Sequence, residues 1–187
     1  ESASGLSAQI DFLVLTPKIF FVIECKNLYG DIEINSKGDF IRTVTYGGRK
    51  YREGIYSPIT QNQRHLQVMK ERKGENQGIF PRAMGDKYFS NFHKGLVVLA
   101  NPKTVVNDRY AKKEVKSQVI RADQLISVMK QMNKESKELS SGLKELKEAG
   151  QRWLNRCKSN PADRIAKFRE MLAEEAASEP EKKPQAE

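Results

Sequence analysis

The sequence predicts a mixed α/β domain followed by an α-helical extension, and three features lead to this prediction. Two runs rich in Ile, Val, Leu and Phe, residues 9–15 and 19–26, have the length and composition of strands. Residues 94–101 contain a continuous apolar run, Leu96–Ala100, and predict a further strand that is buried on both faces. From about residue 133 the apolar residues recur at helical spacing. We therefore expect a mixed sheet core flanked by helices, with a helical C-terminal extension.

The first half of the chain predicts two hairpins and a helix. The strands at residues 9–15 and 19–26 are joined by the short turn Thr16-Pro17-Lys18, so we expect them to be antiparallel. Residues 31–47 alternate between apolar and polar types around a turn and predict a second hairpin. Residues 47–57 are rich in glycine and charge and are interpreted as a loop.

A helix is expected next, with Ser57 as its N-cap, Pro58 at its first position and its end near Lys73. Residues 74–92 show no periodicity and are expected to be irregular. Residues 117–132 predict a short strand and then a helix capped by Asp123. The predicted order of elements is therefore β-β-β-β-α-β-β-α.

The C-terminal part predicts two amphipathic helices. Four apolar residues of the first helix are expected to share one face: Leu139, Leu143, Leu146 and Trp153. The second is expected to start at an Asn160 cap before Pro161 and to carry an apolar stripe made of Ile165, Phe168 and Leu172. We predict a core at residues 1–132, a helical extension at 133–176 and a disordered tail at 177–187. The extension is expected to pack on the sheet, to form a homo-oligomer or to bind a protein partner, and its pattern leaves these uses open.

The charge of the chain indicates a polyanionic partner. The net charge is +9, and residues 1–130 contain 21 Lys and Arg against 13 Asp and Glu. Such a basic domain favours nucleic acid as the partner, although simple solubility is an alternative. No run of 18 apolar residues is present, and the N-terminus lacks the pattern of a signal peptide, so no membrane role is expected. Cys25 and Cys157 are too far apart for a metal motif and are expected to be reduced thiols of a cytoplasmic protein.

Three charged residues lie within the first predicted hairpin, and their spacing brings them together. Glu24 and Lys26 are two residues apart, so they project from one face of their strand. A turn at residues 16–18 places Asp11 opposite residues 23–25 on the partner strand, at a Cβ separation of about 5 Å. Two carboxylates this close need a compensating cation.

Two explanations of this cluster are open from spacing alone. The first is a structural ion pair at the end of a sheet. The second is a divalent metal site in which Asp11, Glu24 and the backbone carbonyl of Cys25 are the ligands, since Mg²⁺ takes one or two carboxylates, waters and phosphate oxygens, and Mn²⁺ suits the same oxygen donors. Lys26 would then orient or deprotonate a water and stabilise charge on a phosphorane-like transition state. That arrangement suits hydrolysis of a phosphodiester bond.

The same residues carry a resemblance to a known family. Gln9-Ile10-Asp11, then Val22-Ile23-Glu24-Cys25-Lys26-Asn27 and Gly30 resemble the core of the nuclease-related domain (NERD), a branch of the PD-(D/E)xK nuclease superfamily. The family also has an N-P-x-x-Q helix start, which resembles the segment Ser57–Gln61 here, with Ser in place of Asn. The resemblance covers about residues 8–130.

The resemblance implies a restriction-endonuclease-like fold and a catalytic set. It implies that Asp11 and Glu24 are metal ligands, that Lys26 is the catalytic lysine, and that Gln61 is a supporting polar residue. Superfamily members often add an acidic residue from a helix before the first core strand. No such helix precedes Asp11 in this sequence, so we expect that residue and its helix to lie upstream of residue 1.

Further residues are candidates for nucleic-acid binding. His65 lies one helical turn after Gln61, next to Arg64, and either contacts the scissile phosphate or packs in the core. Arg49, Lys50 and Arg52 alternate with Tyr46, Tyr51 and Tyr56, a mixture that suits phosphate contact and base stacking but is also found in solvated loops. The basic cluster at residues 107–116 is interpreted as a solvated face, and His93 as structural or solvent-exposed.

Together these features predict a Mg²⁺- or Mn²⁺-dependent nuclease that hydrolyses nucleic acid, with DNA favoured. The alternative is a catalytically silent module on the same fold that binds nucleic acid or a protein partner.

Overall fold

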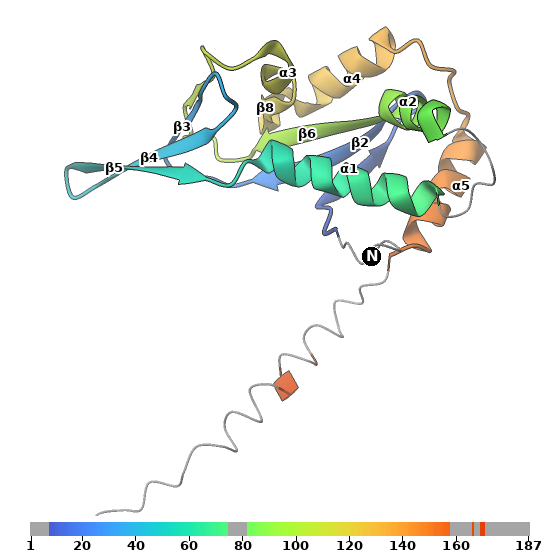
Figure 1. The fold of residues 1–187 in the computed structure, drawn as a ribbon, viewed down its shortest axis with the longest axis horizontal. Coiled ribbons are helices and arrows are strands. Elements are labelled where there is room, and N and C mark those ends of the chain that lie inside the picture. The colour runs from blue at the N-terminus through green and yellow to red at the C-terminus, as the bar shows by residue number, and fades with distance from the viewer. Residues whose placement is uncertain (1–7, 75–81, 158–165, 167–168, 171–187) are drawn as a thin grey trace, which may run out of the picture. The chain divides into compact units, whose positions relative to one another are not determined.

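The computed structural model describes residues 8–74, 82–157, 166 and 169–170 (Figure 1). The chain divides into two compact units, Glu1–Glu148 and Ala149–Glu187. The first unit is a mixed α/β fold with two four-stranded sheets. The second predicted C-terminal helix lies outside the described residues for nearly all of its length. Within the described residues, no helix is both long enough and apolar enough to cross a membrane.

The first sheet has the strand order β1-β2-β6-β8. Its strands are β1 (Phe12–Leu15), β2 (Phe20–Lys26), β6 (His93–Leu99) and β8 (Val119–Arg121). The β1–β2 pair is antiparallel, as predicted, whereas β2, β6 and β8 are parallel to one another. The central strand β6 is buried at its last four residues, which agrees with the continuous apolar run in the sequence.

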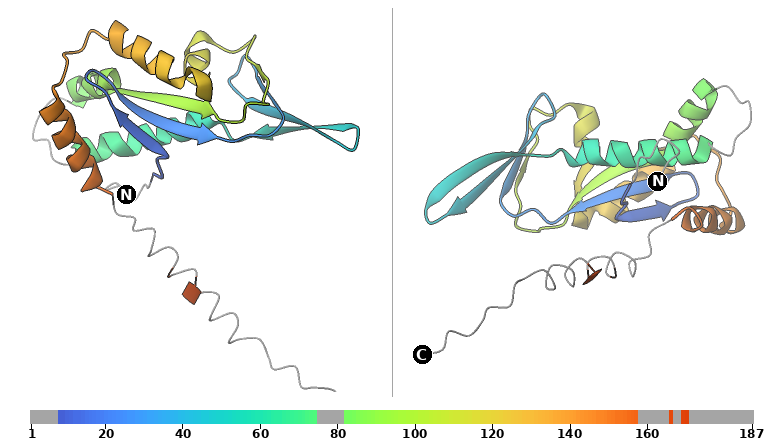
Figure 2. Two further views of the ribbon diagram at one scale, coloured as in Figure 1. Left: turned by 180° about the vertical axis from the view of Figure 1, so that it is seen from behind. Right: turned by 60° about the horizontal axis from the view of Figure 1, so that its bottom comes forward.

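Helices cover both faces of this sheet (Figure 2). Ile19, directly before β2, and the alternate strand residues Phe21 and Ile23 pack with Met129 of α4 (Leu125–Glu135). The opposite face, which carries Glu24, contacts α1 (Pro58–Gly74). The two faces of β2 thus divide as the alternation of its side chains predicts, one apolar and one bearing charge.

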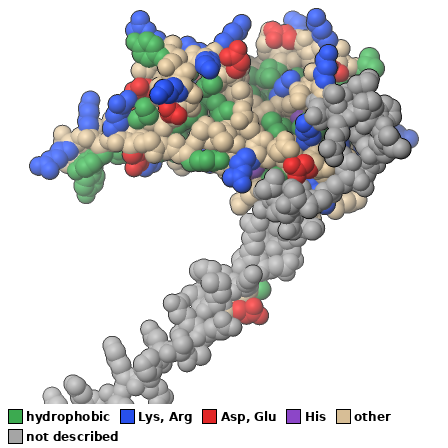
Figure 3. All heavy atoms as spheres, viewed as in Figure 1, with side chains coloured by type: hydrophobic (Ala, Val, Ile, Leu, Met, Phe, Trp, Pro, Cys, Tyr) green, Lys and Arg blue, Asp and Glu red, His purple; other side chains and the backbone are tan. Residues whose placement is uncertain are grey.

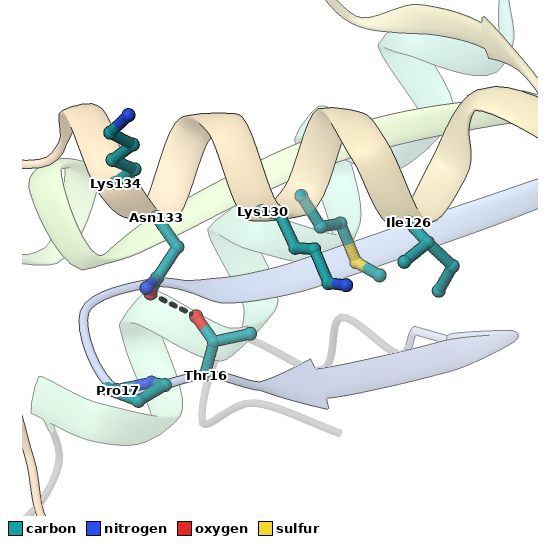
Figure 4. Close-up of a pocket in the computed structure, with 7 residues that line it drawn as sticks. Thr16, Pro17, Ile126, Lys130, Asn133 and Lys134 are labelled. Carbon is teal, nitrogen blue, oxygen red and sulfur yellow. Dashed lines mark hydrogen bonds between the residues drawn. The ribbon is translucent and has the colours of Figure 1, made fainter.

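The β1–β2 turn is tied to helix α4 on the apolar face (Figure 4). Asn133 Oδ1 accepts a hydrogen bond from the backbone N–H of Lys18 at 3.0 Å and lies 2.8 Å from the Thr16 hydroxyl oxygen. An apolar pocket beside this contact is lined in part by Pro17 and Ile126. None of its lining residues belongs to the predicted site, so we assign it no role.

The second sheet has the order β5-β4-β3-β7. Its strands are β3 (Asp31–Ile34), β4 (Phe40–Tyr46), β5 (Arg49–Ile55) and β7 (Val106–Asn107). The β3–β4 pair is the second predicted hairpin, and β7 runs parallel to β3. A second core cluster, which includes Ile32, Phe40 and Val97, joins this sheet to the first.

Strand β5 corrects the prediction of a loop at residues 47–57. Gly47 and Gly48 both have positive φ, at 56° and 75°, and form the two-residue turn that suits a tight hairpin. The strand itself was missed because six of its seven residues are exposed and carry no apolar alternation. The β4–β5 hairpin projects beyond the rest of the sheet (Figures 1 and 2). We call residues 42–53 the arm.

Other elements also differ from the prediction. Residues 82–92 form helix α2 (Arg82–Phe92) rather than irregular chain, while residues 75–81 lie outside the described residues. Asp123 is not the cap of α4, because it lies within a 3₁₀ turn (Ala122–Gln124) that precedes the helix. The short helix α3 (Lys113–Lys116) was not expected.

The first C-terminal helix is shorter than its apolar pattern suggests. Helix α5 spans Leu143–Leu154, so Leu139 precedes it and does not join its face. Leu139 is 87% exposed, and the backbone N–H of nearby Ser141 donates instead to Pro17 O at 2.8 Å. The helical spacing of Leu139 from Leu143 therefore arises by chance, because Leu139 lies in a non-helical segment before α5.

Candidate active site

Strand β2 carries the two charged residues of the motif on the face that contacts α1. Glu24 is 1% exposed, although it is an acid, and Lys26 lies two residues beyond it at the end of the strand. The Lys26 Nζ atom lies 2.6 Å from Glu24 Oε1. The backbone carbonyl of Lys26 accepts a hydrogen bond from the N–H of Ala100 at 3.0 Å, which keeps this end of β2 joined to the chain after β6.

Asp11 lies directly before β1, at the position that would continue the pairing of β1 with β2 by one residue. Phe12 pairs with Ile23 in the antiparallel register, so Asp11 stands opposite Glu24, as predicted. The Asp11 Oδ2 atom accepts a hydrogen bond from the backbone N–H of Cys25 at 2.8 Å. Since the N–H and C=O of one strand residue point toward the same neighbouring strand, the Cys25 carbonyl is directed toward the same edge as Asp11.

Helix α1 brings two further predicted residues to the carboxylates. Its start is capped as expected, with the Ser57 hydroxyl oxygen 3.4 Å from the N–H of Thr60. Gln61 Oε1 accepts a hydrogen bond from Lys26 Nζ at 3.0 Å. One turn later, His65 Nδ1 lies 3.6 Å from Glu24 Oε2. The two residues therefore face the same side of the helix, and both reach β2.

Asn62 anchors this helix to the sheet and was missed by sequence reasoning. The residue is 3% exposed, and its Nδ2 atom donates to Val22 O at 2.9 Å and to Leu96 O at 3.0 Å, so it bridges β2 and β6. A Cβ at Gly95 would lie 3.0 Å from this Nδ2 atom, so the glycine leaves room for the amide. The signals available in the sequence were an asparagine next to Gln61 and a glycine at the start of an apolar strand.

The buried histidine is held in its neutral form. His65 is 6% exposed, and burial lowers its pKa below the ordinary value of 6.5. The nearby carboxylates of Glu24 and Asp11 oppose this shift, whereas Lys26 and Arg64 add to it. At neutral pH the imidazole is therefore uncharged, and Lys26 supplies the positive charge that faces Glu24.

One carboxylate oxygen and one ring nitrogen at this site lack partners. Among the described residues, neither Glu24 Oε2 nor His65 Nδ1 has a hydrogen-bond partner, and both atoms are buried. A buried polar atom without a partner is costly, and a bound water or ion is one way in which such an atom is satisfied. No group of three or more His, Cys, Asp or Glu side chains suited to a metal ion occurs in the part of the chain that the structure describes.

The remaining predicted residues lie elsewhere. Arg64 is exposed on α1 beside the site. Arg49, Lys50 and Arg52 lie on β5, in the second sheet, and Arg52 donates to Glu33 Oε2 at 2.9 Å. The structure thus brings together Asp11, Glu24, Lys26, Gln61 and His65, while the basic residues of β5 form a separate surface. His93 is buried and stacks on Phe89, with ring centroids 3.9 Å apart.

The segment after the motif is held by a buried threonine. Thr104 is 2% exposed, and its hydroxyl group donates to Leu28 O at 2.6 Å. The Arg121 side chain in turn donates to Thr104 O at 3.1 Å. These contacts join the chain that follows Lys26 to strands β7 and β8, and no sequence pattern pointed to them.

The fold and the cluster define a mixed α/β protein with a buried acid and a lysine at the end of a central strand, next to a second acid from the adjacent hairpin. The family model of the nuclease-related domain matches residues 2–100, and the chain belongs to this family. No curated protein and no solved structure gave a significant match.

Proposed function

We propose that this protein is a divalent-metal-dependent nuclease that hydrolyses phosphodiester bonds, with DNA as the favoured substrate, on a core of the restriction-endonuclease type. The observation that carries the proposal is the contact of Lys26 with both Glu24 Oε1 at 2.6 Å and Gln61 Oε1 at 3.0 Å. The acid and the helix glutamine of the family motif therefore both contact its lysine, in a chain that belongs to a family of nuclease-related proteins.

The donor set fits a small, hard cation. Glu24 Oε2 has no hydrogen-bond partner among the described residues, and Asp11 uses only Oδ2 on the Cys25 N–H, so each carboxylate keeps one oxygen for a ligand. Mg²⁺ needs only one or two protein carboxylates, because waters and phosphate oxygens complete its shell, and Mn²⁺ suits the same donors. Asp11, Glu24 and the Cys25 carbonyl would hold the ion, which when bound polarises the phosphate and activates a water.

The lysine supplies the positive charge of the site. Its side chain is 27% exposed, so the ammonium group bridges the buried Glu24 and the solvent side where a phosphate would enter. There Lys26 can donate to the attacking water or to a phosphate oxygen as negative charge develops. Gln61 Oε1 accepts a hydrogen bond from the ammonium group and Glu24 Oε1 lies 2.6 Å from it, so these two partners leave one N–H for the water or the phosphate.

The exposed basic side chains of the chain would attract the nucleic-acid substrate. Arg64 is exposed on α1 one residue before the buried His65, and the chain has a net charge of +9. Contacts between Lys or Arg side chains and phosphates release counterions from the nucleic acid. Nucleic-acid binding should therefore weaken steeply as the salt concentration increases.

The test is cleavage of labelled plasmid and single-stranded DNA with Mg²⁺, Mn²⁺ or EDTA. The wild-type chain is compared with Lys26→Ala and with Lys70→Ala, a change to another lysine of the described part, in helix α1. We expect metal-dependent cleavage that Lys26→Ala abolishes and Lys70→Ala retains. Urea unfolding of each variant shows whether the lost activity reflects lost structure.

Two results would argue against the proposal. Cleavage that persists in Lys26→Ala would point to a contaminating nuclease or another site. DNA binding without cleavage in any metal would favour the silent binding module instead, since that module needs the basic surface but not the lysine.

A further inference from the structure

The arm has two chemically different faces, which its pairing register defines. Tyr46 pairs with Arg49 and Val44 pairs with Tyr51, so these four residues lie on one face. Thr45 pairs with Lys50 and Thr43 with Arg52 on the other face. In Figure 3, hydrophobic side chains lie along one side of the hairpin, and Lys and Arg side chains occupy its tip and other side. We call the face that carries Tyr46, Val44, Arg49 and Tyr51 the tyrosine face.

The tyrosine face leaves two aromatic rings exposed to solvent. Tyr46 is 78% exposed and Tyr51 is 54% exposed, although Phe40 on the same face at the base of the hairpin is 1% exposed. The face therefore begins in the core at Phe40, passes the Arg42–Glu53 ion pair and continues outward as an uncovered surface. Two exposed rings on a projecting hairpin do not contribute to the core, and they present an aromatic surface to a ligand.

The charges on the arm divide into paired and available groups. Arg42 is paired with Glu53, and Arg52 with Glu33. For Arg49 and Lys50, beside the turn, no carboxylate partner is present among the described residues. Both are exposed, and Arg49 shares the tyrosine face with Tyr46. Rings flanked by available cations suit a ligand that offers both flat bases and phosphates.

The spacing of the rings favours separated bases over a duplex. Tyr46 and Tyr51 are diagonal neighbours across the strand pair, at roughly 7 Å. Successive bases in a stacked duplex strand lie about 3.4 Å apart, which leaves no space for a ring between them. The rings can therefore stack on the bases of a single strand, whereas a duplex would contact only the cations of the arm.

The arm is firmly connected to the candidate active site. Tyr29 follows Lys26 by three residues and is 61% exposed, and Gly30 then approaches β4. A Cβ at Gly30 would lie 2.4 Å from Thr43 O and 3.0 Å from Val44 Cγ2. The chain that leaves the catalytic motif thus packs directly on the base of the arm, so a strand held by the arm has a defined position relative to Lys26.

We propose that the arm is a platform for single-stranded nucleic acid, in which Tyr46 and Tyr51 stack on bases and Arg49 and Lys50 contact phosphates. This deepens the proposed function and rests on it, because it assigns the nuclease a substrate with a single-stranded region. A single strand that lies along the tyrosine face is led toward the segment Asn27–Gly30 and the lysine before it.

Binding without catalysis tests the platform. Fluorescence anisotropy in EDTA compares labelled oligo-dT of about 20 nucleotides, longer than the site of one binding fold, with a blunt duplex of the same length. We expect Tyr46→Ala and Tyr51→Ala each to weaken oligo-dT binding by about fivefold or more, the loss of one stacked base. Duplex binding should change less than about twofold, since its phosphate contacts remain.

Three controls separate stacking from other effects. Tyr46→Phe keeps the ring and should bind oligo-dT like the wild-type chain. Tyr110→Ala removes a tyrosine that is 65% exposed but lies off the arm, and it should have no effect. Arg49→Ala should weaken the binding of oligo-dT and of the duplex alike.

The outcomes are distinguishable from those of the cleavage test. Equal losses for oligo-dT and duplex in the tyrosine variants, or no loss in either, would overturn the platform even if Lys26-dependent cleavage is found. Failure of the wild-type chain to bind oligo-dT would overturn it as well. Selective loss of oligo-dT binding would support it even if no cleavage is detected.

Discussion

The Lys26 ammonium group lies 2.6 Å from the Oε1 atom of Glu24, whose side chain is 2% exposed, so a buried acid at the end of β2 is neutralised by a partly exposed lysine. Removal of one member of such a pair leaves an uncompensated charge. We therefore expect Lys26→Ala to lower the free energy of unfolding by about 3 kcal/mol. Urea unfolding in EDTA at neutral pH measures this loss.

The double variant Glu24→Gln/Lys26→Met is the matched control for that loss. It removes both charges with little change in volume, so its stability should return to within about 1 kcal/mol of the wild-type value. If Glu24 binds metal, Mg²⁺ should raise the midpoint of thermal unfolding more in Lys26→Ala than in the wild-type chain, and not at all in the double variant. Equal shifts in all three proteins would contradict a metal site at Glu24.

Asn62 should prove to be a positioning residue for helix α1. Its two hydrogen bonds to Val22 O and Leu96 O bridge β2 and β6, and each contributes about 1 kcal/mol. Asn62→Ala is expected to cost about 2–3 kcal/mol, since it also leaves a small cavity. Gln63→Ala, at the exposed neighbouring position, should change stability by less than about 0.5 kcal/mol.

A kinetic measurement separates positioning by Asn62 from general stability. Gln61 and His65 reach β2 from the helix that Asn62 anchors, so Asn62→Ala should lower kcat under conditions in which the variant is fully folded. An unchanged kcat would mean that the helix keeps its position without these bonds, and that Asn62 contributes stability alone.

The sequence predicted the β1–β2 hairpin and its charged residues because two independent signals agreed there. Alternation along β2 separated Glu24 and Lys26 from the apolar face, and the length of the turn set the register that places Asp11 opposite Glu24. Helix α1 was predictable from its cap and its proline. Its contact with β2 was not derivable from spacing, because it depends on the buried amide of Asn62 and on the absence of a side chain at Gly95.

The two missed strands, β5 and β7, were missed for different physical reasons. Strand β5 is exposed on both faces, so no hydrophobic pattern marks it, and only the Gly47-Gly48 turn signalled a hairpin. Strand β7 has two residues, Val106–Asn107, and is defined by its pairing with β3 rather than by its own composition. A local hydrophobic pattern therefore fails both where a strand is exposed on both faces and where a strand is defined by a distant partner.

Gly30 is expected to control the position of the arm. It has a φ of 94°, and a Cβ there would lie 2.4 Å from Thr43 O, a backbone atom of β4 that cannot move without the strand. Gly38→Ala is a matched control, because Gly38 has a φ of 88° but its nearest neighbour would be at 3.9 Å. We expect Gly38→Ala to cost about 1–2 kcal/mol from backbone strain alone, and Gly30→Ala at least about 3 kcal/mol.

The two glycine variants should also differ in function. Gly30→Ala should reduce cleavage of single-stranded DNA beyond its effect on the folded fraction, because β4 must shift away from the segment that follows Lys26. Equal free energies of unfolding for the two variants would show that the chain accommodates the Cβ without moving β4.

The buried His93 should make stability depend on pH. Burial lowers its pKa to about 4 from an ordinary value of 6.5, although its hydrogen bond to Phe89 O opposes the shift. The unfolded chain therefore takes up a proton at a higher pH than the folded chain. The stability that the neutral ring contributes is fully present above pH 6.5 and is lost as the pH falls toward about 4, by about 3 kcal/mol in total.

His93→Phe tests this assignment, since it keeps a ring between Phe89 and Phe20 but cannot take up a proton. The variant should be less stable than the wild-type chain at pH 7, because the hydrogen bond to Phe89 O is lost, yet its stability should fall less between pH 6.5 and 4. Urea unfolding at several pH values gives both slopes. His65→Gln removes the other histidine and is the control: it should keep the part of the pH dependence of stability that is due to His93. If the free energy of unfolding depends on pH in the same way in His93→Phe and in the wild-type chain, the acid sensitivity belongs to other groups.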